Sequence, residues 1–290
     1  MAKILISILQ LGTIDYPTGL RLQEKLVSLR KECRIGDVVL LLEHTPVITL
    51  GRNAKSKNIV ATPELLSQRG VEVHECDRGG DVTFHGPGQL VAYPIFDLRG
   101  FPSDGASRKT LGAIEYVRRL EEVLIRSCAD FGIAAKRILG LTGVWTEASA
   151  PATSKEHVGT GALARPVESQ NRQPSSGAES KIAALGVHIS RGVTSHGVAL
   201  NVNTDLSFFN LIIPCGITSK PVTSMQKELN RPIAMREVAH SLSRNFGTVF
   251  GSQILWLDSL DALLGTNLGV PMKAPKNLRR IHREDDPAWA

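Results

Sequence analysis

The chain has 290 residues, of which 42% are hydrophobic and 21% are charged, and its formal net charge at pH 7 is +6. These values are ordinary for a globular protein and allow one large domain or two small ones, while no apolar run approaches the ~20 residues needed to cross a bilayer. Nucleic acid is one explanation of the positive charge, but aromatic residues make up only 5% of the chain, too few for base-stacking platforms. Attraction to an acidic protein partner explains the charge equally well.

The cysteines and the N-terminus favour an intracellular protein. No pair among the four cysteines, Cys33, Cys76, Cys128 and Cys215, has the CxxC spacing of a zinc site or a thioredoxin-like motif. Scattered cysteines in a chain of this length are typical of a reduced compartment. Residues 1–12 lack the basic region and the cleavage site of a secretory signal.

The first half of the chain alternates short apolar strands with helices. Leu22, Leu26 and Leu29 have helical spacing within residues 18–31, and Thr18 is the expected N-cap. The unbroken apolar run 38–42 predicts a strand covered on both faces. Other expected elements are strands at 3–11, 47–50 and 71–75, a turn at 43–46, and a short helix that opens at Thr62-Pro63 and ends at Gly70.

The second half contains the longest predicted helix, residues 107–131, which Gly132 stops and whose buried stripe includes Leu111, Ile114 and Cys128. Other expected elements are strands at 90–97, 143–145, 181–189 and 193–202, a helical turn at 204–209 and a helix at 236–250. The last two of those strands are expected to pair through the turn 190–192. Residues 147–180 are rich in Ala, Ser, Pro, Gly and Gln and predict a disordered insertion, and the basic tail after residue 272 predicts a solvated segment.

One stretch is unusually dense in glycine: Arg78-Gly79-Gly80-Asp81-Val82-Thr83-Phe84-His85-Gly86-Pro87-Gly88-Gln89-Leu90. Gly79 and Gly80 allow the backbone to approach a ligand closely or to take positive φ, and the Gly-Pro-Gly segment is a rigid turn. The stretch predicts a glycine-rich binding loop that crosses from one strand to the next, whereas a lone glycine pair would indicate an ordinary turn.

Cys215 and Lys181 are the candidates for chemistry. Cys215 lies in a tight Pro-Cys-Gly turn after an apolar run, where a thiol is accessible, while the other three cysteines fit the pattern of small buried hydrophobes. Lys181 opens a strand; if it reaches Cys215, it favours the thiolate and can donate and accept a proton. His196 and His85 are rival partners for the thiol, and His44 is interpreted as structural.

These pieces together resemble the lipoyl(octanoyl) transferases, which move an octanoyl chain from acyl carrier protein to a lysine of lipoyl-carrying domains. Four segments carry the match, in the family's order: Leu41-Leu42-Glu43-His44-Thr45-Pro46-Val47 with Gly51-Arg52; the glycine-rich stretch; Gly143-Val144-Trp145 with Lys181-Ile182-Ala183-Ala184-Leu185-Gly186-Val187; and Thr194-Ser195-His196-Gly197 with Pro214-Cys215-Gly216. The insertion at 147–180 and the longer C-terminal tail depart from the bacterial pattern without removing a motif residue.

The resemblance implies an α+β fold like that of the biotin and lipoate protein ligases, with mixed β-sheets flanked by helices. It places a single catalytic domain at residues 1–265 and a flexible basic tail at 266–290. It makes Cys215 the nucleophile that holds the acyl group as a thioester, and Lys181 the acid/base. The substrate-binding residues it implies are Arg78, Gly79, Gly80, Asp81, Val82, Thr83, Phe84, His85, Ala184, Leu185, Gly186, Gly197, Val198 and Ala199.

The same resemblance implies no cofactor or metal, octanoyl-acyl carrier protein as the donor, and as acceptors the lipoyl domains of 2-oxoacid dehydrogenase complexes and the glycine cleavage H protein. It implies neither a nucleic-acid nor a membrane partner. The expected compartment is the mitochondrion, with the bacterial cytoplasm as the alternative. Small residues at Ala183, Ala184, Gly186 and Gly197 are expected to leave room for an alkyl chain, each buried methylene of which contributes roughly 0.8 kcal/mol.

Three other functions remain open. An ATP-dependent lipoate or biotin ligase of the same fold would not need Cys215. A binding module for lipoyl domains or nucleic acid would form no acyl-enzyme. A thioesterase using Cys215 and His196 would release free octanoate.

Overall fold

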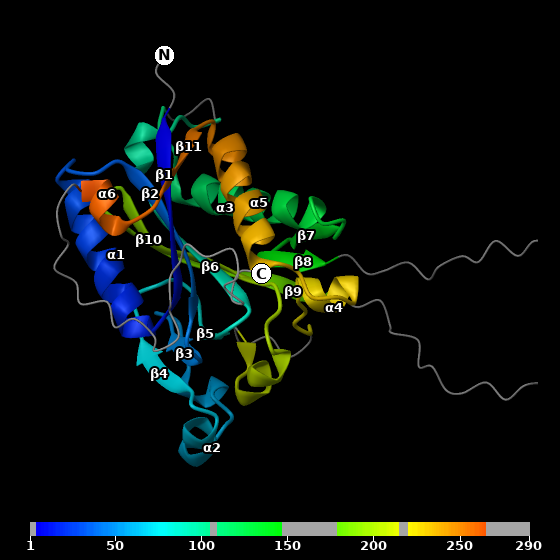
Figure 1. The fold of residues 1–290 in the computed structure, drawn as a ribbon. Helices are drawn as coiled ribbons and strands as arrows, with labels where there is room; N and C mark the ends of the chain where they lie inside the picture. The colour runs from blue at the N-terminus through cyan, green and yellow to red at the C-terminus, as the bar shows by residue number, and fades with distance from the viewer. Residues whose placement is uncertain (1–3, 105–108, 147–178, 215–219, 265–290) are drawn as a thin grey trace, which may run out of the picture.

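The computed structural model describes residues 4–104, 109–146, 179–214 and 220–264. Most of the expected insertion, Cys215 and the tail therefore lie outside the described residues. An eight-stranded sheet forms the centre of the fold (Figure 1). Its strands, in spatial order, are β11 (Gln253–Leu257), β1 (Leu5–Ile14), β2 (Asp37–His44), β6 (Gln89–Ile95), β10 (Val193–Asn201), β9 (Lys181–Ser190), β8 (Leu141–Thr146) and β7 (Ala135–Ile138). Strand β1 is parallel to β2 and β11 and the other neighbours are antiparallel, so the sheet is mixed as expected.

A second, three-stranded sheet has the order β4 (Glu72–Glu75), β3 (Val47–Leu50) and β5 (Val82–His85). The helices are α1 (Tyr16–Lys31), α2 (Pro63–Gln68), α3 (Ala113–Ala129), α4 (Met225–Leu229), α5 (Met235–Phe250) and α6 (Leu260–Leu264). In the described part of the chain, 3₁₀ turns cover Ser56–Asn58, Leu98–Gly100 and Leu206–Leu211.

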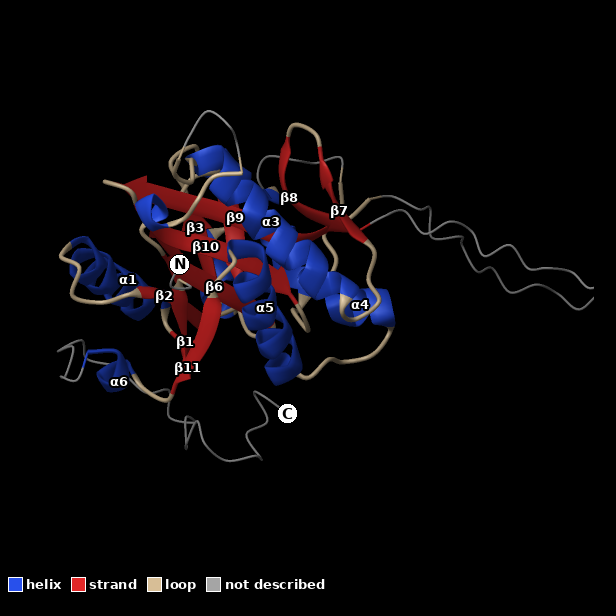
Figure 2. Cartoon of the chain, turned by 90° about the horizontal axis from the view of Figure 1, so that it is seen from above, coloured by secondary structure: helices blue, strands red, loops and turns tan. Residues whose placement is uncertain are grey.

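Strand β2 shows why the large sheet is covered on both faces. Side chains alternate across a strand, so Val39 and Leu41 pack in the core beneath α3 and α5, while Val38 and Leu40 pack with α1. The two helix layers lie on opposite sides of the sheet (Figure 2). The prediction that the apolar run 38–42 is a strand buried on both faces is confirmed.

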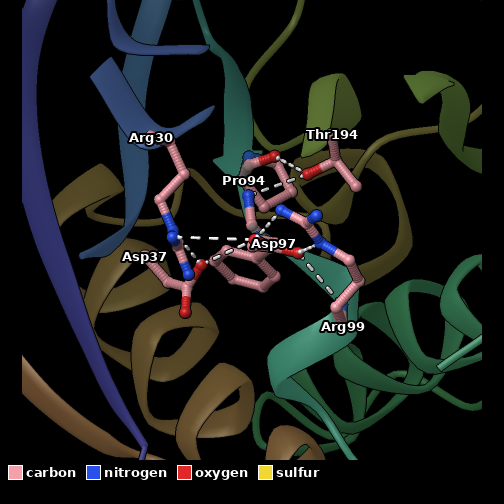
Figure 3. A network of polar contacts seen from close by, with 7 residues as sticks. Arg30, Asp37, Pro94, Asp97, Arg99 and Thr194 are labelled. Carbon is pink, nitrogen blue, oxygen red and sulfur yellow. Dashed lines mark hydrogen bonds and ion pairs between the residues drawn. The ribbon is translucent and has the colours of Figure 1, made fainter. Parts of the chain in front are cut away.

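A polar network ties the edges of this core together (Figure 3). The guanidinium of Arg30, at the end of α1, donates from Nε to Asp37 at 2.9 Å, and the backbone N–H of Asp97 donates to the same carboxylate at 2.8 Å. Burial raises the pKa of Asp37, whereas the hydrogen bonds from Arg99 hold the pKa of Asp97 below its usual value. The network fixes the start of β2 against the end of β6.

Several sequence expectations are corrected in the first half of the chain. Asp15 is the N-cap of α1, because its carboxylate accepts the Thr18 N–H at 2.8 Å; Thr18 lies inside the helix. Cys33 is exposed and takes φ +57° after α1, so it is not a small buried hydrophobe. Residues 43 and 44 belong to β2 and not to a turn.

Other corrections concern the helices and the glycine-rich stretch. Helix α3 begins at Ala113, and Ile114 is 82% exposed, so the expected start at 107 and the expected burial of Ile114 are wrong. The stretch 78–90 is not one loop, because β5 lies within it and pairs with β3. Strands β7 and β11 and helices α4 and α6 were not predicted, since they are short or partly exposed and carry weak periodicity.

Candidate active site

A narrow, mainly apolar cavity lies where the small sheet meets β9 and β10. Three separate sequence segments that were expected to bind substrate converge on it. The predicted residues that line it are Arg78, Gly80, Asp81, Thr83, His85, Ala184, Leu185, Gly186, Gly197, Val198 and Ala199. The remaining walls come from Tyr16, Val91, Tyr93 and His196. The fold therefore brings together segments that are more than a hundred residues apart in sequence.

The other three predicted residues do not line the cavity. Because β5 alternates, Thr83 and His85 face the cavity while Val82 and Phe84 pack in a separate core with Ile48. Gly79 instead donates its backbone N–H to the Val187 carbonyl at 3.0 Å. It attaches the glycine-rich stretch to β9 and holds that side of the cavity together.

Gly186 and Gly197 have a packing role that differs from the expected one. A Cβ atom at position 186 would come within 2.7 Å of the Gly79 carbonyl oxygen, and one at 197 would collide with the Ala92 carbonyl. Ala183 is buried in the core beneath α3. These small residues allow backbone segments to approach one another. The space that a larger side chain would occupy is therefore filled by neighbouring backbone and is not all open to a ligand.

Arg78 is a buried cation in the cavity wall. It is 7% exposed, and Nη2 donates to the Thr49 carbonyl at 2.7 Å and to the Thr49 hydroxyl at 2.8 Å. Its Nη1 donates to the Gly79 carbonyl at 3.1 Å. The planar guanidinium can donate to all three acceptors at once. Arg78 therefore fixes Thr49 of β3 relative to Gly79 of the glycine-rich stretch.

His44 and Tyr93 form a buried pair that supports one wall. His44 Nδ1 lies 3.0 Å from the Ile14 carbonyl, which can only accept, so the ring donates there. Burial lowers the pKa of His44 to about 4, and the neutral ring accepts the Tyr93 O–H at its Nε2, 2.7 Å away. His44 is structural, as predicted, and it orients a tyrosine that sequence reasoning missed.

His85 reaches the cavity in a defined tautomer. Gln89 donates from its amide nitrogen to the Asn201 side-chain oxygen at 2.9 Å, so its own oxygen accepts from His85 Nδ1 at 2.7 Å. Burial, and then the charges of His44 and Arg78, lower the pKa of His85 to about 3. The ring is therefore neutral at physiological pH and its Nε2 is an acceptor.

Tyr16 is a further wall residue that no motif signalled. It is 2% exposed, and among the described residues its hydroxyl has no hydrogen-bond partner of good geometry. Burial raises its pKa. The start of α1 reaches this site only through the tertiary fold. The sequence shows an aromatic residue next to Pro17 and nothing that marks Tyr16 as part of a ligand cavity.

Lys181 lies beyond the Ala184 end of the cavity, at the start of β9. It is 7% exposed, and its Nζ atom lies 5.3 Å from the centroid of the Trp145 ring. Its backbone N–H donates to the Pro221 carbonyl at 2.8 Å, so the chain that follows residue 219 returns directly to this point. Cys215 lies outside the described residues, and Lys181 does not line the cavity.

Pro214 shows where the chain leading to Cys215 arrives. The N–H of the preceding Ile213 donates to the Asn58 carbonyl at 2.7 Å, and the Asn58 side chain donates to Asp81 at 2.6 Å. Asp81 lines the cavity. Ile213, two residues before Cys215 in the sequence, is thereby linked through Asn58 to a residue of the cavity lining.

In the described part of the chain, no helix is long and apolar enough to cross a membrane. Within the same part of the chain, no group of three or more His, Cys, Asp or Glu side chains is arranged to hold a metal ion.

Comparison with known proteins identifies the family. The profile of the lipoyl protein ligase A/B catalytic domain matches residues 15–247. An octanoyltransferase from Koribacter versatilis is 55% identical over 281 residues, covering 97% of this chain and 98% of the relative. An octanoyltransferase from Acidobacterium capsulatum is 53% identical and covers 90% of this chain and 96% of its own.

Solved structures show the same fold. A bipartite lipoate protein ligase from Thermoplasma acidophilum superposes with a TM-score of 0.63 at 15% identity, over 90% of each chain. A lipoate-protein ligase A bound with ATP gives a TM-score of 0.61 at 14% identity, over 91% of this chain and 92% of its own. The predicted α+β fold of the lipoate ligases is confirmed. The relatives named above come from bacteria, and they give the mitochondrial expectation no support. The sequence relatives together with the family profile show that the chain belongs to the octanoyltransferases, a family of acyltransferases with the lipoyl protein ligase A/B catalytic domain.

Proposed function

We propose that this chain transfers an octanoyl group from octanoyl-acyl carrier protein to a lysine of a lipoyl domain through a thioester on Cys215. The observation that carries the proposal is the narrow apolar cavity between β5, β9 and β10, whose lining residue Asp81 is linked through Asn58 to Ile213, two residues before Cys215 in the sequence. An acyl chain in this cavity would present its carbonyl carbon toward Cys215.

The first step is thiol exchange. The Cys215 thiolate attacks the carbonyl carbon of the donor thioester, a new C–S bond forms, and the bond to the phosphopantetheine sulfur breaks. Because one thioester replaces another, the step costs little free energy and needs no nucleotide. The leaving thiolate takes a proton, for which Lys181 is the donor.

The second step makes the amide. The lysine amine of the acceptor domain attacks the acyl-enzyme carbonyl, a C–N bond forms, and the Cys215 thiolate leaves. The amine loses a proton, which Lys181 accepts, so one ammonium group serves both steps. Supporting this role, Lys181 is held under Trp145 and is nearly inaccessible to bulk water.

The donor's charge suits the surface around Pro214. A groove of about 620 Å³ there is lined by Phe209, Ile213, Lys220 and Lys227 among others. Acyl carrier proteins are acidic, so these lysines and the overall charge of +6 favour encounter. We propose lipoyl domains of 2-oxoacid dehydrogenase complexes and the glycine cleavage H protein as acceptors, and the bacterial cytoplasm as the compartment.

One experiment separates this function from the alternatives. The protein is mixed with a purified lipoyl domain and, in separate reactions, with one of two acyl donors. With octanoyl-acyl carrier protein and no ATP, the domain should gain one octanoyl amide. With free octanoate and ATP it should gain none. Transfer from octanoate that requires ATP and survives Cys215→Ala would establish a ligase instead. Release of free octanoate without amide formation would establish a thioesterase, and no reaction with either donor would leave a binding module.

A further inference from the structure

The cavity and a second, wider space meet at one side chain, that of His196. His196 lines the cavity, and it also lines a groove of about 390 Å³ formed with Gln23, Asp77 and His188. Since His196 is only 2% exposed, its ring is enclosed between the two spaces. The groove is open to solvent and is bordered on the α1 side by apolar surface from Leu20 and Val27.

Among the β10 residues that line the cavity, His196 lies at the opposite end from Ala199. In the antiparallel pairing of β9 and β10, Ala184 faces Ala199 and Val187 faces His196. His196 is therefore three residues further along the strands from Ala184, a distance of about 10 Å at ~3.3 Å per residue. Seven zigzag carbon–carbon bonds of ~1.5 Å each span roughly 9 Å. The methyl end of an eight-carbon acyl chain that starts near Asp81 and Ala184 would reach the His196 ring.

The ring is fixed by contacts on both sides of the backbone. The His196 N–H donates to the Gln23 side-chain oxygen at 2.6 Å, and the ring Nε2 lies 2.7 Å from the Asp77 carboxylate, to which it donates. His196 also has φ +55° in the middle of a strand, a conformation that is unfavourable for residues other than glycine and, to a lesser degree, Asn and Asp. Such a conformation persists only where neighbouring contacts determine it, so the position of this ring is closely specified.

We propose that His196, positioned by Asp77, is the stop that sets the longest acyl chain this enzyme accepts. The inference rests on the proposed function and deepens it, because it names the side chain that measures the substrate. With the ring in place, a longer chain meets an imidazole and a carboxylate. Without the ring, the cavity joins the groove, and further methylene groups can extend along Leu20 and Val27.

The test measures transfer of acyl chains of 8, 12 and 16 carbons from acyl carrier protein to a lipoyl domain. The first variant, His196→Gly, removes the ring and suits the positive φ. The second, His196→Asn, has a shorter side chain, and asparagine tolerates positive φ better than most residues. The control is Arg191→Gly in the β9–β10 turn, a position with φ +53° whose side chain is exposed and lines neither space. It relieves the same backbone strain without opening the wall.

We expect the ratio of kcat/KM for 12 carbons to that for 8 carbons to rise at least tenfold in His196→Gly, to rise less in His196→Asn, and to stay unchanged in Arg191→Gly. The rise should come mainly from a lower KM for the longer chain, which a merely structural defect would not produce. An unchanged ratio in either folded His196 variant overturns the inference. If the wild-type protein transfers no acyl chain at all, the proposed function falls, and with it this inference.

Discussion

The backbone of Gly143 lies directly against the side chain of Lys181. A Cβ atom at position 143 would come within 2.6 Å of the Lys181 Cε atom and 3.3 Å of its Nζ atom, and Gly143 has φ +135°. Glycine at 143 thus leaves the space in which the Lys181 side chain lies beneath Trp145.

The Gly143→Ala substitution should therefore displace the Lys181 ammonium. We expect kcat for octanoyl transfer to fall at least tenfold, equivalent to about 1.4 kcal/mol in the barrier, and stability to fall by about 1–3 kcal/mol from backbone strain. The matched control is Gly36→Ala, where an added Cβ meets nothing within 4 Å. Wild-type turnover in folded Gly143→Ala would show that the position of Lys181 is unimportant.

Glu121 and Glu122 are neighbours on α3 that differ in burial, which gives a matched pair of substitutions. The Glu121 side chain is fully buried and accepts from Arg118 at 2.7 Å and Arg137 at 3.1 Å. That of Glu122 is 33% exposed and pairs with Arg126 and Arg137. We expect Glu121→Gln to lower the free energy of unfolding by about 1–3 kcal/mol and Glu122→Gln by less than about 1 kcal/mol. Urea denaturation of both variants measures this difference, and equal losses would contradict it.

The neutral histidines behind the cavity predict acid sensitivity. Burial lowers the pKa of His44 to about 4 and that of His85 to about 3, whereas an unfolded histidine titrates near 6.5. The unfolded state therefore binds more protons as the pH falls below 6.5, so stability decreases. Between pH 6.5 and pH 5 the loss is on the order of 2 kcal/mol for each histidine.

Denaturant midpoints at pH 7 and pH 5 measure this loss. In His44→Gln the difference between the two midpoints should shrink, because one of the three histidines buried in the described part of the chain, His44, His85 and His196, no longer titrates. A difference as large as that of the wild-type protein would show that His44 does not contribute in this way.

Arg78 should not be replaceable by lysine. A single ammonium cannot reproduce the hydrogen bonds to the Thr49 carbonyl and hydroxyl and to the Gly79 carbonyl. We expect Arg78→Lys to cost about 1–3 kcal/mol, because a buried acceptor is left unpaired, and to raise the KM for the acyl donor. Arg69→Lys, at an exposed residue stacked on Phe208, is the control and should change neither property. A thermal melt and initial rates decide the outcome.

The sequence predicted much of this architecture because local pattern and tertiary role agree there. The apolar run 38–42 is typical of a doubly covered strand, and the β9–β10 hairpin follows from two regular strands around a short turn. Residues of three expected substrate-binding segments, 78–85, 184–186 and 197–199, also line one cavity.

What the sequence did not reveal depends on tertiary contacts. Nothing local distinguishes Tyr16 or Tyr93 from core aromatics, and the alternation of β5 became visible only once its pairing with β3 was known. The positive φ of His196 inside a strand also leaves no trace in a propensity pattern, because Gln23 and Asp77 impose it from distant parts of the chain.

The most direct test of the central claim is the intact mass of the protein after mixing with octanoyl-acyl carrier protein in the absence of an acceptor. The wild-type protein should gain one octanoyl group, and Cys215→Ser should gain no octanoyl thioester. Cys76→Ser, which removes the half-buried thiol that borders the groove beyond His196, should gain one octanoyl group like the wild type. An octanoyl thioester that persists in Cys215→Ser, or amide transfer by a wild-type protein that never carries the acyl group, would contradict the account.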